Sequence, residues 1–338
     1  MAETDEILHR EPGVDRLDRQ LLHVLEIDGR APFGRIAAVL GSSEQTIARR
    51  YRRLRDQGVV RVLCFPTFVA AAQPTLLRLH VQPGAGRPLA AALAKRDDVA
   101  WISLMDGGAE IACGLRARTS GSREALLLEH LPRTGRVLGM TALTVLHVFP
   151  TPGRAGWDGF PDPLTPQQVA ELATNVRTGA AAHARLQAED DDLLRLLARD
   201  GRTSYAALAE QTGRSPAQVA RRVEALLASG VVYVDVEIAA QPLGYTTSAR
   251  VYLRVAPARL RHVGQQLAEH AETAFVGAVT GSINIVASLV CRDLDHLYTY
   301  VTDTLGRMSA IQSVETTVVT ADIKQAATLM QGSRLAAG

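Results

Sequence analysis

A dense group of arginines lies between positions 49 and 61. Six arginines share this span with one aspartate, for a net charge of +5: Arg49, Arg50, Arg52, Arg53, Arg55 and Arg61. Guanidinium groups bind phosphates, and every phosphate that is neutralised releases counterions, so a concentrated positive face is what binding to a nucleic acid requires. Arginines can also form the solvated face of an ordinary helix. Six arginines against one acid favour the nucleic acid.

The other reactive residues show no catalytic or metal-binding spacing. The nine histidines are dispersed, and Cys64, Cys113 and Cys291 have neither paired spacing nor histidines at zinc distances. The sequence also contains no nucleophile motif and no phosphate loop. We therefore expect no catalytic residue, no metal and no cofactor. Unpaired cysteines, an acidic N-terminus and the absence of about 18 consecutive apolar residues favour a cytoplasmic protein without a membrane partner.

The arginines belong to a segment that occurs twice. Asp18–Val60 aligns with Asp190–Val232 without a gap, and 17 of the 43 aligned pairs are identical. This period is far longer than that of a solenoid repeat and indicates a duplicated domain. The second copy of the arginine segment has Arg221 and Arg222 against Glu224, a net charge of only +1 over residues 221–233.

Three short helices are predicted in each copy. In the first they span about 17–27, 33–40 and 43–57, with Gly29, Gly41 and Gly58 at their ends and Ser43 as an N-cap. In the second, Ser215 and Gln218 form a capping box. A tight turn before the third helix is typical of a helix-turn-helix unit, whose third helix enters the DNA major groove. The predicted contacts to double-stranded DNA are Ser43, Gln45, Thr46, Arg49, Arg50, Arg52, Arg53, Arg221 and Arg222.

A strand-rich segment with the order βαββαβ follows each helical unit. Its predicted elements span 76–81, 87–95, 99–105, 110–115, 122–131 and 142–149 in the first copy and 247–255, 257–270, 274–279, 283–290, 293–305 and 314–320 in the second. The predicted fold class is α+β: two copies of a winged, three-helix helix-turn-helix domain, each followed by a ferredoxin-like βαββαβ domain. The domain boundaries are 15–62, 63–149, a linker with a short helix at 150–185, 186–236 and 237–325.

These motifs resemble a known family. The pattern Asp18-x-x-Leu21-Leu22-x-x-Leu25-x-x-Asp28-Gly29-Arg30, followed by Ile36-Ala37, Gly41, Ser43, Arg49-Arg50, Leu54 and Gly58-Val59-Val60, is similar to the DNA-binding domain of the leucine-responsive (Lrp/AsnC) regulators. The resemblance implies a transcriptional regulator whose βαββαβ domains bind an effector and dimerise. Members are usually half this length, so it also implies an intramolecular pseudo-dimer, as well as a homo-oligomer.

The resemblance implies an effector site as well. Small metabolites, often amino acids, bind family members near the turn between the second and third strands. The corresponding residues are Asp106, Gly107, Gly108 and Glu110 in the first copy and Thr280, Gly281, Ser282 and Asn284 in the second. Alternatively, the glycines only form hairpin turns. Glu110 replaces the shorter aspartate that is common in the family. One interpretation of this replacement is that the first site is altered or silent.

Two other functions remain open. Siroheme decarboxylases are similar to this family, also pair two such modules, and use His and Tyr residues near a bound tetrapyrrole. The corresponding segments here, 99–103 and 274–277, contain no His-Asn-Tyr cluster. A ligand sensor without DNA binding is the second alternative, and the arginines of the first copy disfavour it.

Two expectations follow from the duplication. The two βαββαβ units should pair within one chain, because the helices of each unit cover only one face of its sheet. The DNA site should be asymmetric, because Glu44, Gln45 and Thr46 are replaced by Pro216, Ala217 and Gln218 in the second copy. The alternative is that the second helical unit has lost DNA contact and serves only in packing.

Overall fold

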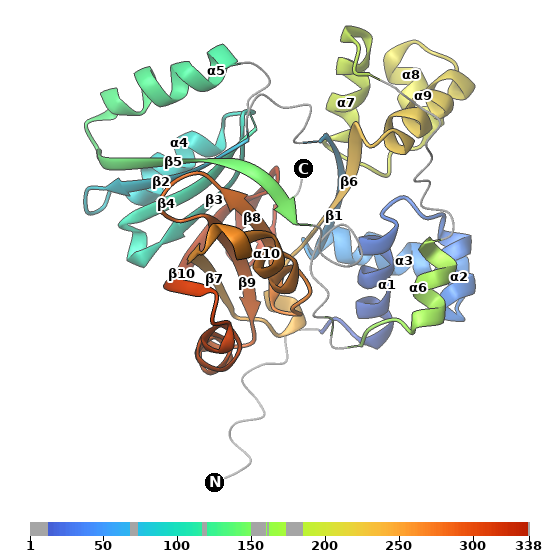
Figure 1. Ribbon diagram of the computed structural model, residues 1–338. Coiled ribbons are helices and arrows are strands. Elements are labelled where there is room, and N and C mark those ends of the chain that lie inside the picture. The colour runs from blue at the N-terminus through green and yellow to red at the C-terminus, as the bar shows by residue number, and fades with distance from the viewer. Residues whose placement is uncertain are drawn as a thin grey trace.

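The computed structural model describes residues 13–67, 74–116, 120–149, 160, 162–173 and 185–336. Both predicted three-helix units are present: α1 (Arg16–Ile27), α2 (Phe33–Leu40) and α3 (Glu44–Asp56), then α7 (Asp191–Leu197), α8 (Tyr205–Thr212) and α9 (Pro216–Ala228). They begin where the caps predict. The Ser43 side chain accepts from the Thr46 amide, and Ser215 and Gln218 form the predicted capping box. The two units form two lobes on one side of the molecule (Figure 1).

Both βαββαβ units are also confirmed. The first contains β2 (Thr75–Val81), α4 (Gly86–Ala94), β3 (Val99–Met105), β4 (Glu110–Leu115), α5 (Ser120–Glu124) and β5 (Val137–Phe149). The second contains β7 (Thr247–Val255), α10 (Leu260–Ala268), β8 (Thr273–Val279), β9 (Ile285–Cys291), α11 (Leu294–Thr299) and β10 (Ile311–Gln325). A π-helical segment extends both α5 and α11.

The two units pair through their last strands. β5 pairs first with β2 and then, through Val145–Phe149, with β8 of the other unit. β10 does the reverse, pairing first with β7 and then with β3. The strand order β10-β3-β4-β2-β5-β8-β9-β7, with β10 also bonded to β7, is a closed ring. The units therefore pair within the chain as expected, by exchange of strand ends as well as by face packing.

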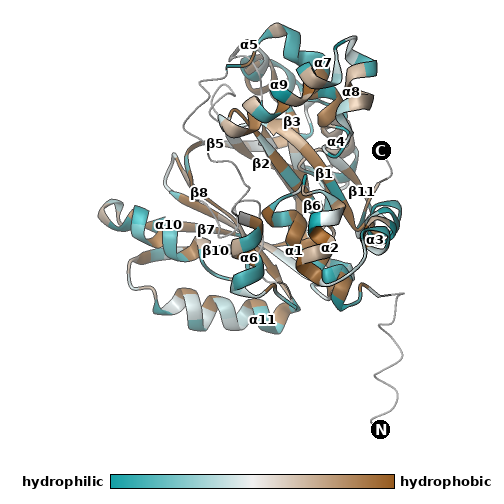
Figure 2. Cartoon of the chain, turned by 90° about the vertical axis from the view of Figure 1, so that its right-hand side faces the viewer, coloured by the Kyte–Doolittle hydropathy of each residue, from teal (hydrophilic) through white to brown (hydrophobic). Residues whose placement is uncertain are grey.

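The exchange carries side chains into the other unit's core. Phe149, at the end of β5, is 4% exposed and belongs to the core under α10 in the second unit. Ile323, on β10, packs reciprocally into the core under α4. The apolar colour of the strands in Figure 2 reflects these two cores and a smaller apolar cluster inside the ring, which includes Leu76, Leu143 and Val286. Each half consequently needs the other to complete its core.

Two strands that join the helical units to the ring were not predicted individually. β1 (Val60–Pro66) pairs antiparallel with β6 (Val232–Ile238), and this two-stranded ribbon lies between the lobes (Figure 1). Leu63 pairs with Asp235, which occupies the equivalent position in the second copy. A pseudo-twofold axis thus passes between these two residues. The alternation of Val232, Val234 and Val236 with polar residues was the available signal.

The C-terminal strands were also missed. β11 (Thr328–Gln331) and β12 (Arg334–Leu335) form a hairpin beyond β10. This hairpin returns to the first helical unit, where the Leu335 amide donates to the Gly58 carbonyl at 2.8 Å and Arg61 donates to the Ala336 carbonyl at 2.9 Å. The C-terminal hairpin therefore fixes the end of α3 to the ring.

The predicted linker helix is α6 (Pro166–Ala173). It packs on the first helical unit, with Leu172 fully buried and Arg35 donating to the Glu171 and Leu172 carbonyls at 2.6 and 2.8 Å. Residues 150–159, at the start of the predicted linker, lie outside the described residues. In the part of the chain that the structure describes, none of the helices has the length and apolar character needed to cross a membrane.

Candidate functional sites

The exposed face of α3 displays part of the predicted DNA-contact set. Gln45, Arg49 and Arg52 are exposed along one side of the helix. Ser43 and Thr46 are engaged at its N-terminus, where the Ser43 hydroxyl accepts from the Thr46 amide at 3.1 Å and donates to the Thr46 hydroxyl at 2.8 Å. These two side chains define the start of α3, and the three exposed side chains form its outward face.

Arg50 and Arg53 have partners inside the protein. Arg50 contacts Asp15 at 2.6 Å and Asp18 at 2.9 Å, and Arg53 also forms an ion pair with Asp18. Asp18, on α1, has no solvent exposure, so these ion pairs hold α3 against α1. Arg50 is 22% exposed and Arg53 is 45% exposed. A DNA contact by either arginine stays a prediction. The same guanidinium group would have to contact DNA and keep its ion pair with Asp18.

The second unit repeats this pair. Arg222 donates to both carboxylate oxygens of Asp190, at 2.8 Å and at the ion-pair distance of 2.5 Å, and these are the equivalents of Arg50 and Asp18. Burial alone would raise the pKa of Asp190, but hydrogen bonds from Arg222 and the Gln187 amide outweigh it and lower the pKa. The presence of an arginine at this position in both copies, Arg50 and Arg222, is therefore explained by its ion pair within the unit, without reference to DNA.

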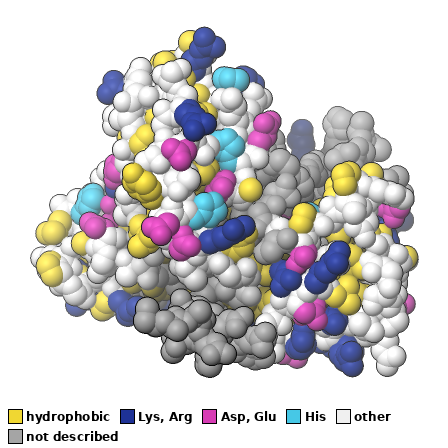
Figure 3. Space-filling model, turned by 90° about the horizontal axis from the view of Figure 1, so that it is seen from below, with side chains coloured by type: hydrophobic (Ala, Val, Ile, Leu, Met, Phe, Trp, Pro, Cys, Tyr) yellow, Lys and Arg dark blue, Asp and Glu magenta, His cyan; other side chains and the backbone are white. Residues whose placement is uncertain are grey.

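In both units exposed arginines share the third helix with exposed acidic side chains, which are Glu44 and Asp56 on α3 and Glu224 on α9. Basic and acidic side chains lie next to one another on the lobe of the first unit, at the right of Figure 3. Among the described residues, neither Arg49 nor Arg221 has a hydrogen-bond or ion-pair partner. In the second unit Arg221 lies beside an open groove of about 570 Å³ between α9 and the start of α7, which Arg214 and Gln218 also line.

The two predicted effector turns are exposed and lie against the opposite unit. Asp106 and Gly107 have positive φ angles of 50° and 64°, and the Gly107 amide donates to the Thr320 hydroxyl of β10 at 3.0 Å. In the second unit the Thr280 hydroxyl accepts from the Thr144 amide of β5 at 3.0 Å. Gly108, Gly281 and Ser282 complete these turns. Both turns are therefore positioned by the strand exchange.

Glu110 and Asn284 face inward from these turns. Glu110 is 3% exposed and accepts from Arg78 at 3.0 and 2.8 Å. Asn284 exchanges hydrogen bonds with the backbone of Val255 at 2.9 and 2.8 Å. The predicted effector residues thus fall into two groups. Those of the turns are largely exposed, whereas Glu110 and Asn284 are hydrogen-bonded within the protein. Effector contact by any of them stays a prediction.

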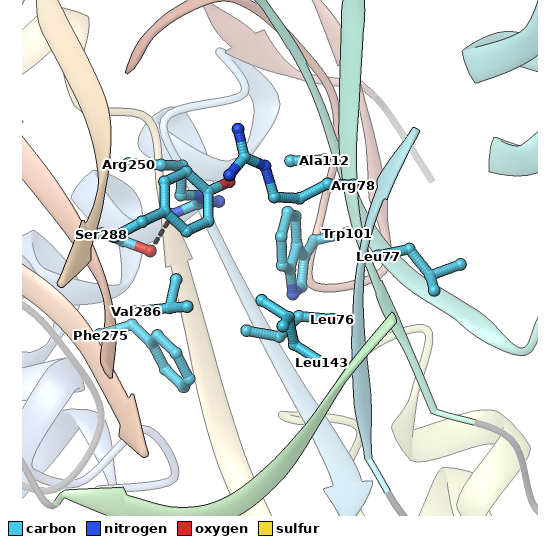
Figure 4. Close-up of a pocket in the computed structure, with 11 residues that line it drawn as sticks. Leu76, Leu77, Arg78, Trp101, Ala112, Leu143, Arg250, Phe275, Val286 and Ser288 are labelled. Atoms are coloured by element: carbon cyan, nitrogen blue, oxygen red, sulfur yellow. Dashed lines mark hydrogen bonds between the residues drawn. The ribbon is translucent and has the colours of Figure 1, made fainter. Parts of the chain in front are cut away.

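The interior of the ring holds a group of polar residues that were not predicted as a site. Arg78, Trp101, Arg250, Tyr252 and Ser288 meet around a narrow void (Figure 4). The guanidinium carbon of Arg78 lies 4.0 Å from the Tyr252 ring centroid, and that of Arg250 lies 4.4 Å from the Trp101 ring centroid. The sequence feature that could have indicated this group is the polar face of the alternating strand 247–255. This face becomes interior when the ring closes.

Comparison with known protein families gives matches to both kinds of domain. The AsnC-type helix-turn-helix domain matches residues 14–55 and 190–227, and the Lrp/AsnC ligand binding domain matches residues 248–329. In the part of the chain that the structure describes, these ranges correspond to α1–α3, α7–α9 and the second βαββαβ unit.

The curated relatives below align with about two fifths of this chain. An uncharacterized HTH-type transcriptional regulator of Pyrococcus furiosus is 31% identical over 133 residues, which are 39% of this chain and 89% of that protein. One from Pyrococcus abyssi is 29% identical over 147 residues, 43% of this chain and 92% of that protein. The regulatory protein AsnC of Escherichia coli is 29% identical over 136 residues, 38% of this chain and 87% of that protein.

One solved structure has the arrangement of the whole chain. The siroheme decarboxylase NirDL has a TM-score of 0.60 and 13% sequence identity, covering 92% of this chain and 93% of its own. NirDL has also been solved with an iron-uroporphyrin III analogue. At this identity the similarity concerns the fold alone.

Proposed function

Because the chain belongs to the Lrp/AsnC family of transcriptional regulators, we propose that it binds double-stranded DNA through α3 and α9 and senses a small metabolite through its βαββαβ units. The observation that carries the DNA part is the outward face of α3. Gln45, Arg49 and Arg52 are exposed there while the buried Asp18 holds the helix in place. The guanidinium groups of Arg49 and Arg52 suit contacts to phosphates and bases, and the amide of Gln45 suits a contact to a base.

The two recognition helices present different surfaces. Gln45 and Arg52 of α3 correspond to Ala217 and Glu224 of α9. The buried positions remain alike, with Ile47 and Val219 both fully buried. We therefore propose that one chain reads an asymmetric DNA site, whereas a symmetric dimer reads half-sites related by its own twofold axis. The ribbon of β1 and β6 fixes the two helical units relative to one another.

The test uses DNA upstream of the protein's own gene, with affinity measured over a range of salt concentrations. The double variant R49A/R52A should bind at least about tenfold more weakly and reduce the salt slope by about two, one unit per lost phosphate contact. R221A should lose less. R133A removes an exposed arginine from the βαββαβ unit and is the control. Equal losses from R49A/R52A and R133A would show that α3 does not contact DNA.

Footprinting tests the asymmetric site. Two protected regions of unlike sequence, one helical turn or a few turns apart, are expected from one chain that uses both units. A palindromic footprint would mean that two chains each present α3, and the asymmetric-site proposal would then be wrong. Protection of a single region would leave α9 as a packing element.

We place the metabolite, for which an amino acid is the proposed class, against the exposed turns. The test compares DNA binding with and without each of the common amino acids. D106A and S282A should weaken the effect of the active amino acid while the affinity for DNA in its absence stays unchanged, because both side chains are exposed and lie on the βαββαβ units. If both variants respond like the unmodified protein, the effector lies elsewhere.

We further propose that the protein does not catalyse a reaction. The fold of NirDL makes siroheme decarboxylation the specific alternative. It can be tested by titration with iron-uroporphyrin III, followed by absorption spectroscopy. No shifted tetrapyrrole band is expected. A band that saturates at one equivalent per chain, with loss of carboxyl groups from the pigment, would support the enzyme instead.

A further inference from the structure

The two βαββαβ units can be aligned through their strand pairing. In the first unit Trp101 pairs with Gly114, and in the second Phe275 pairs with Ser288, next to the same irregularity of register. All four strands of the two units then correspond without a gap. On this alignment Leu76 corresponds to Arg250, and Arg78 corresponds to Tyr252. The alignment shows where the duplicated halves have diverged inside the ring.

Polar residues line a pocket on one side of the pseudo-twofold axis. A pocket of about 460 Å³ lies beside β3, β7, β9 and β10, and we call it the Arg250 pocket. Its polar lining includes Ser103, Ser248, Arg250, Ser288 and Asp322. The equivalent positions in the other half are Gly277, Pro74, Leu76, Gly114 and Val148. One half of the duplication therefore has a polar, charged lining where the other half has none.

Three charged residues line this pocket, Arg250, Asp322 and Lys324, and among the described residues none of them forms an ion pair. The Lys324 ammonium donates to the Arg96 and Val99 carbonyls at 3.1 and 2.7 Å, whereas Arg250 has fewer partners. One of its terminal nitrogens donates to the Ser288 hydroxyl, its Nε is inaccessible to solvent and has no hydrogen-bond partner, and no described carboxylate lies within ion-pair distance. Arg78, on the neighbouring side of the ring, is bonded instead to Glu110 and Glu315. Burial lowers the pKa of Arg250 by more than the charge of Asp322 raises it, yet a guanidinium stays charged at neutral pH. Arg250 is half-buried, and a charge that is partly withdrawn from water without a paired counterion favours a bound anion.

We propose that the Arg250 pocket binds the carboxylate of a small organic acid. Arg250 would hold the carboxylate, with Ser288 beside it, and the Trp101 ring would contact the body of the ligand. Asp322, which accepts from Ser103 at 2.6 Å, lines the same pocket and disfavours a second carboxylate. The pocket adjoins the first exposed turn, because Thr320, which accepts from the Gly107 amide, also lines it. The proposal is independent of DNA binding.

Trp101 provides a direct signal for binding. The chain has two tryptophans, and Trp157 lies outside the described residues, so a W157F background leaves Trp101 as the single indole. The probes are 3-phenylpropionate, its uncharged amide 3-phenylpropanamide, and phenylsuccinate, which has a second carboxylate. We expect 3-phenylpropionate to change the Trp101 fluorescence saturably, and the amide and phenylsuccinate to bind at least about tenfold more weakly.

Variants separate a ligand contact from a structural role. R250M should weaken 3-phenylpropionate binding by about 10- to 100-fold, which corresponds to the loss of a hydrogen bond to a charged group. R254M removes an exposed arginine from the same strand and should bind normally. Without ligand, R250M should unfold at the same or a higher temperature, because it removes a half-buried charge that has no ion-pair partner among the described residues. When 3-phenylpropionate is added, the melting temperature of the R254M control should rise and that of R250M should stay unchanged.

The proposal fails if the amide binds as tightly as 3-phenylpropionate, or if R250M retains its affinity. It also fails if 3-phenylpropionate produces no saturable change in the W157F protein at millimolar concentration. None of these measurements involves DNA, so their failure is distinguishable from a failure of the proposed regulatory function.

Discussion

Arg30 and Arg202 occupy the same position in the two repeats, and each donates hydrogen bonds to the two carbonyls that flank the other. Arg202 donates to Gly29 at 2.6 Å and to Ala31 at 2.8 Å. Arg30 donates to Gly201 and, at 3.3 Å, to Thr203. The two Asp-Gly-Arg turns, which are identical in sequence, are therefore the place where the two helical units contact one another across the pseudo-twofold axis.

Replacing Arg202 should destabilise the protein measurably. R202M removes both hydrogen bonds and the cation–π contact with Phe33, whose ring centroid lies 4.4 Å from the guanidinium carbon. Two charged hydrogen bonds at a largely buried site predict a loss of about 2–4 kcal/mol in the free energy of unfolding. Urea denaturation measures it. R199M, which removes an exposed arginine three residues earlier, should change stability by less than about 0.5 kcal/mol. Equal stability of both variants would contradict the structural role.

Gly201 should not tolerate a side chain. A Cβ atom there would lie 2.8–2.9 Å from backbone atoms of Leu63, and the Gly201 amide donates to the Val62 carbonyl at 2.6 Å. We expect G201A to separate the turn from β1 and to lower the melting temperature. G121A, where a Cβ atom would meet nothing within 4 Å, is the control. A G201A protein as stable as G121A would show that the ribbon can shift without cost.

The pair of Asp190 and Arg222 should make stability depend on acid pH. Because the folded pKa of Asp190 is below the unfolded value of 3.8, its contribution is present above pH 3.8 and is lost as pH falls through the folded pKa. We expect D190N to lose about 1–3 kcal/mol at neutral pH, with a deficit that shrinks as pH falls from 3.8 through the folded pKa of Asp190. Denaturation midpoints over this range test it. A deficit that persists in acid would assign the effect to packing.

Glu237 should have the opposite dependence. Its side chain is 2% exposed and accepts from the Ala327 amide at 2.8 Å, and burial raises its pKa from 4.5 to about 7. The folded state therefore binds a proton that the unfolded state releases between these values, so the free energy of unfolding falls as pH rises from 4.5 to 7. E237Q should be the more stable protein at pH 8, with a difference that shrinks toward pH 4.5. E129Q, at an exposed site, should show no such trend.

The two halves should associate when the chain is cut. Co-expressed residues 1–155 and 156–338 are expected to purify together, because three strand pairings join the halves: β1 with β6, β5 with β8 and β10 with β3. G264L should weaken association, because even a Cβ atom at this position of α10 would lie 2.2 Å from the Phe149 ring. Independent folded monomers from the unmodified halves would contradict the internal dimer.

The elements themselves follow from local sequence. Apolar spacing, Ser43 and Ser215 as caps, and alternating strands are each legible within about ten residues, because helix and strand periodicity depends on neighbours along the chain. The repeat added the architecture, since a duplicated module implies a pseudo-symmetric chain. Family membership and the βαββαβ order were predictable for these reasons.

The use of individual side chains depended on the tertiary structure. Arg50 and Arg53 looked like DNA contacts because their partner Asp18 lies on α1, two helices earlier in the chain. The alternation of residues 247–255 puts Arg250 on the strand face opposite Ala249 and Val251. Alternation shows that a strand has two faces, but it does not show which face is enclosed when a ring closes. Charge compensation and enclosure are set by long-range register, which brings residues such as Arg78 and Glu315 together from opposite halves of the chain.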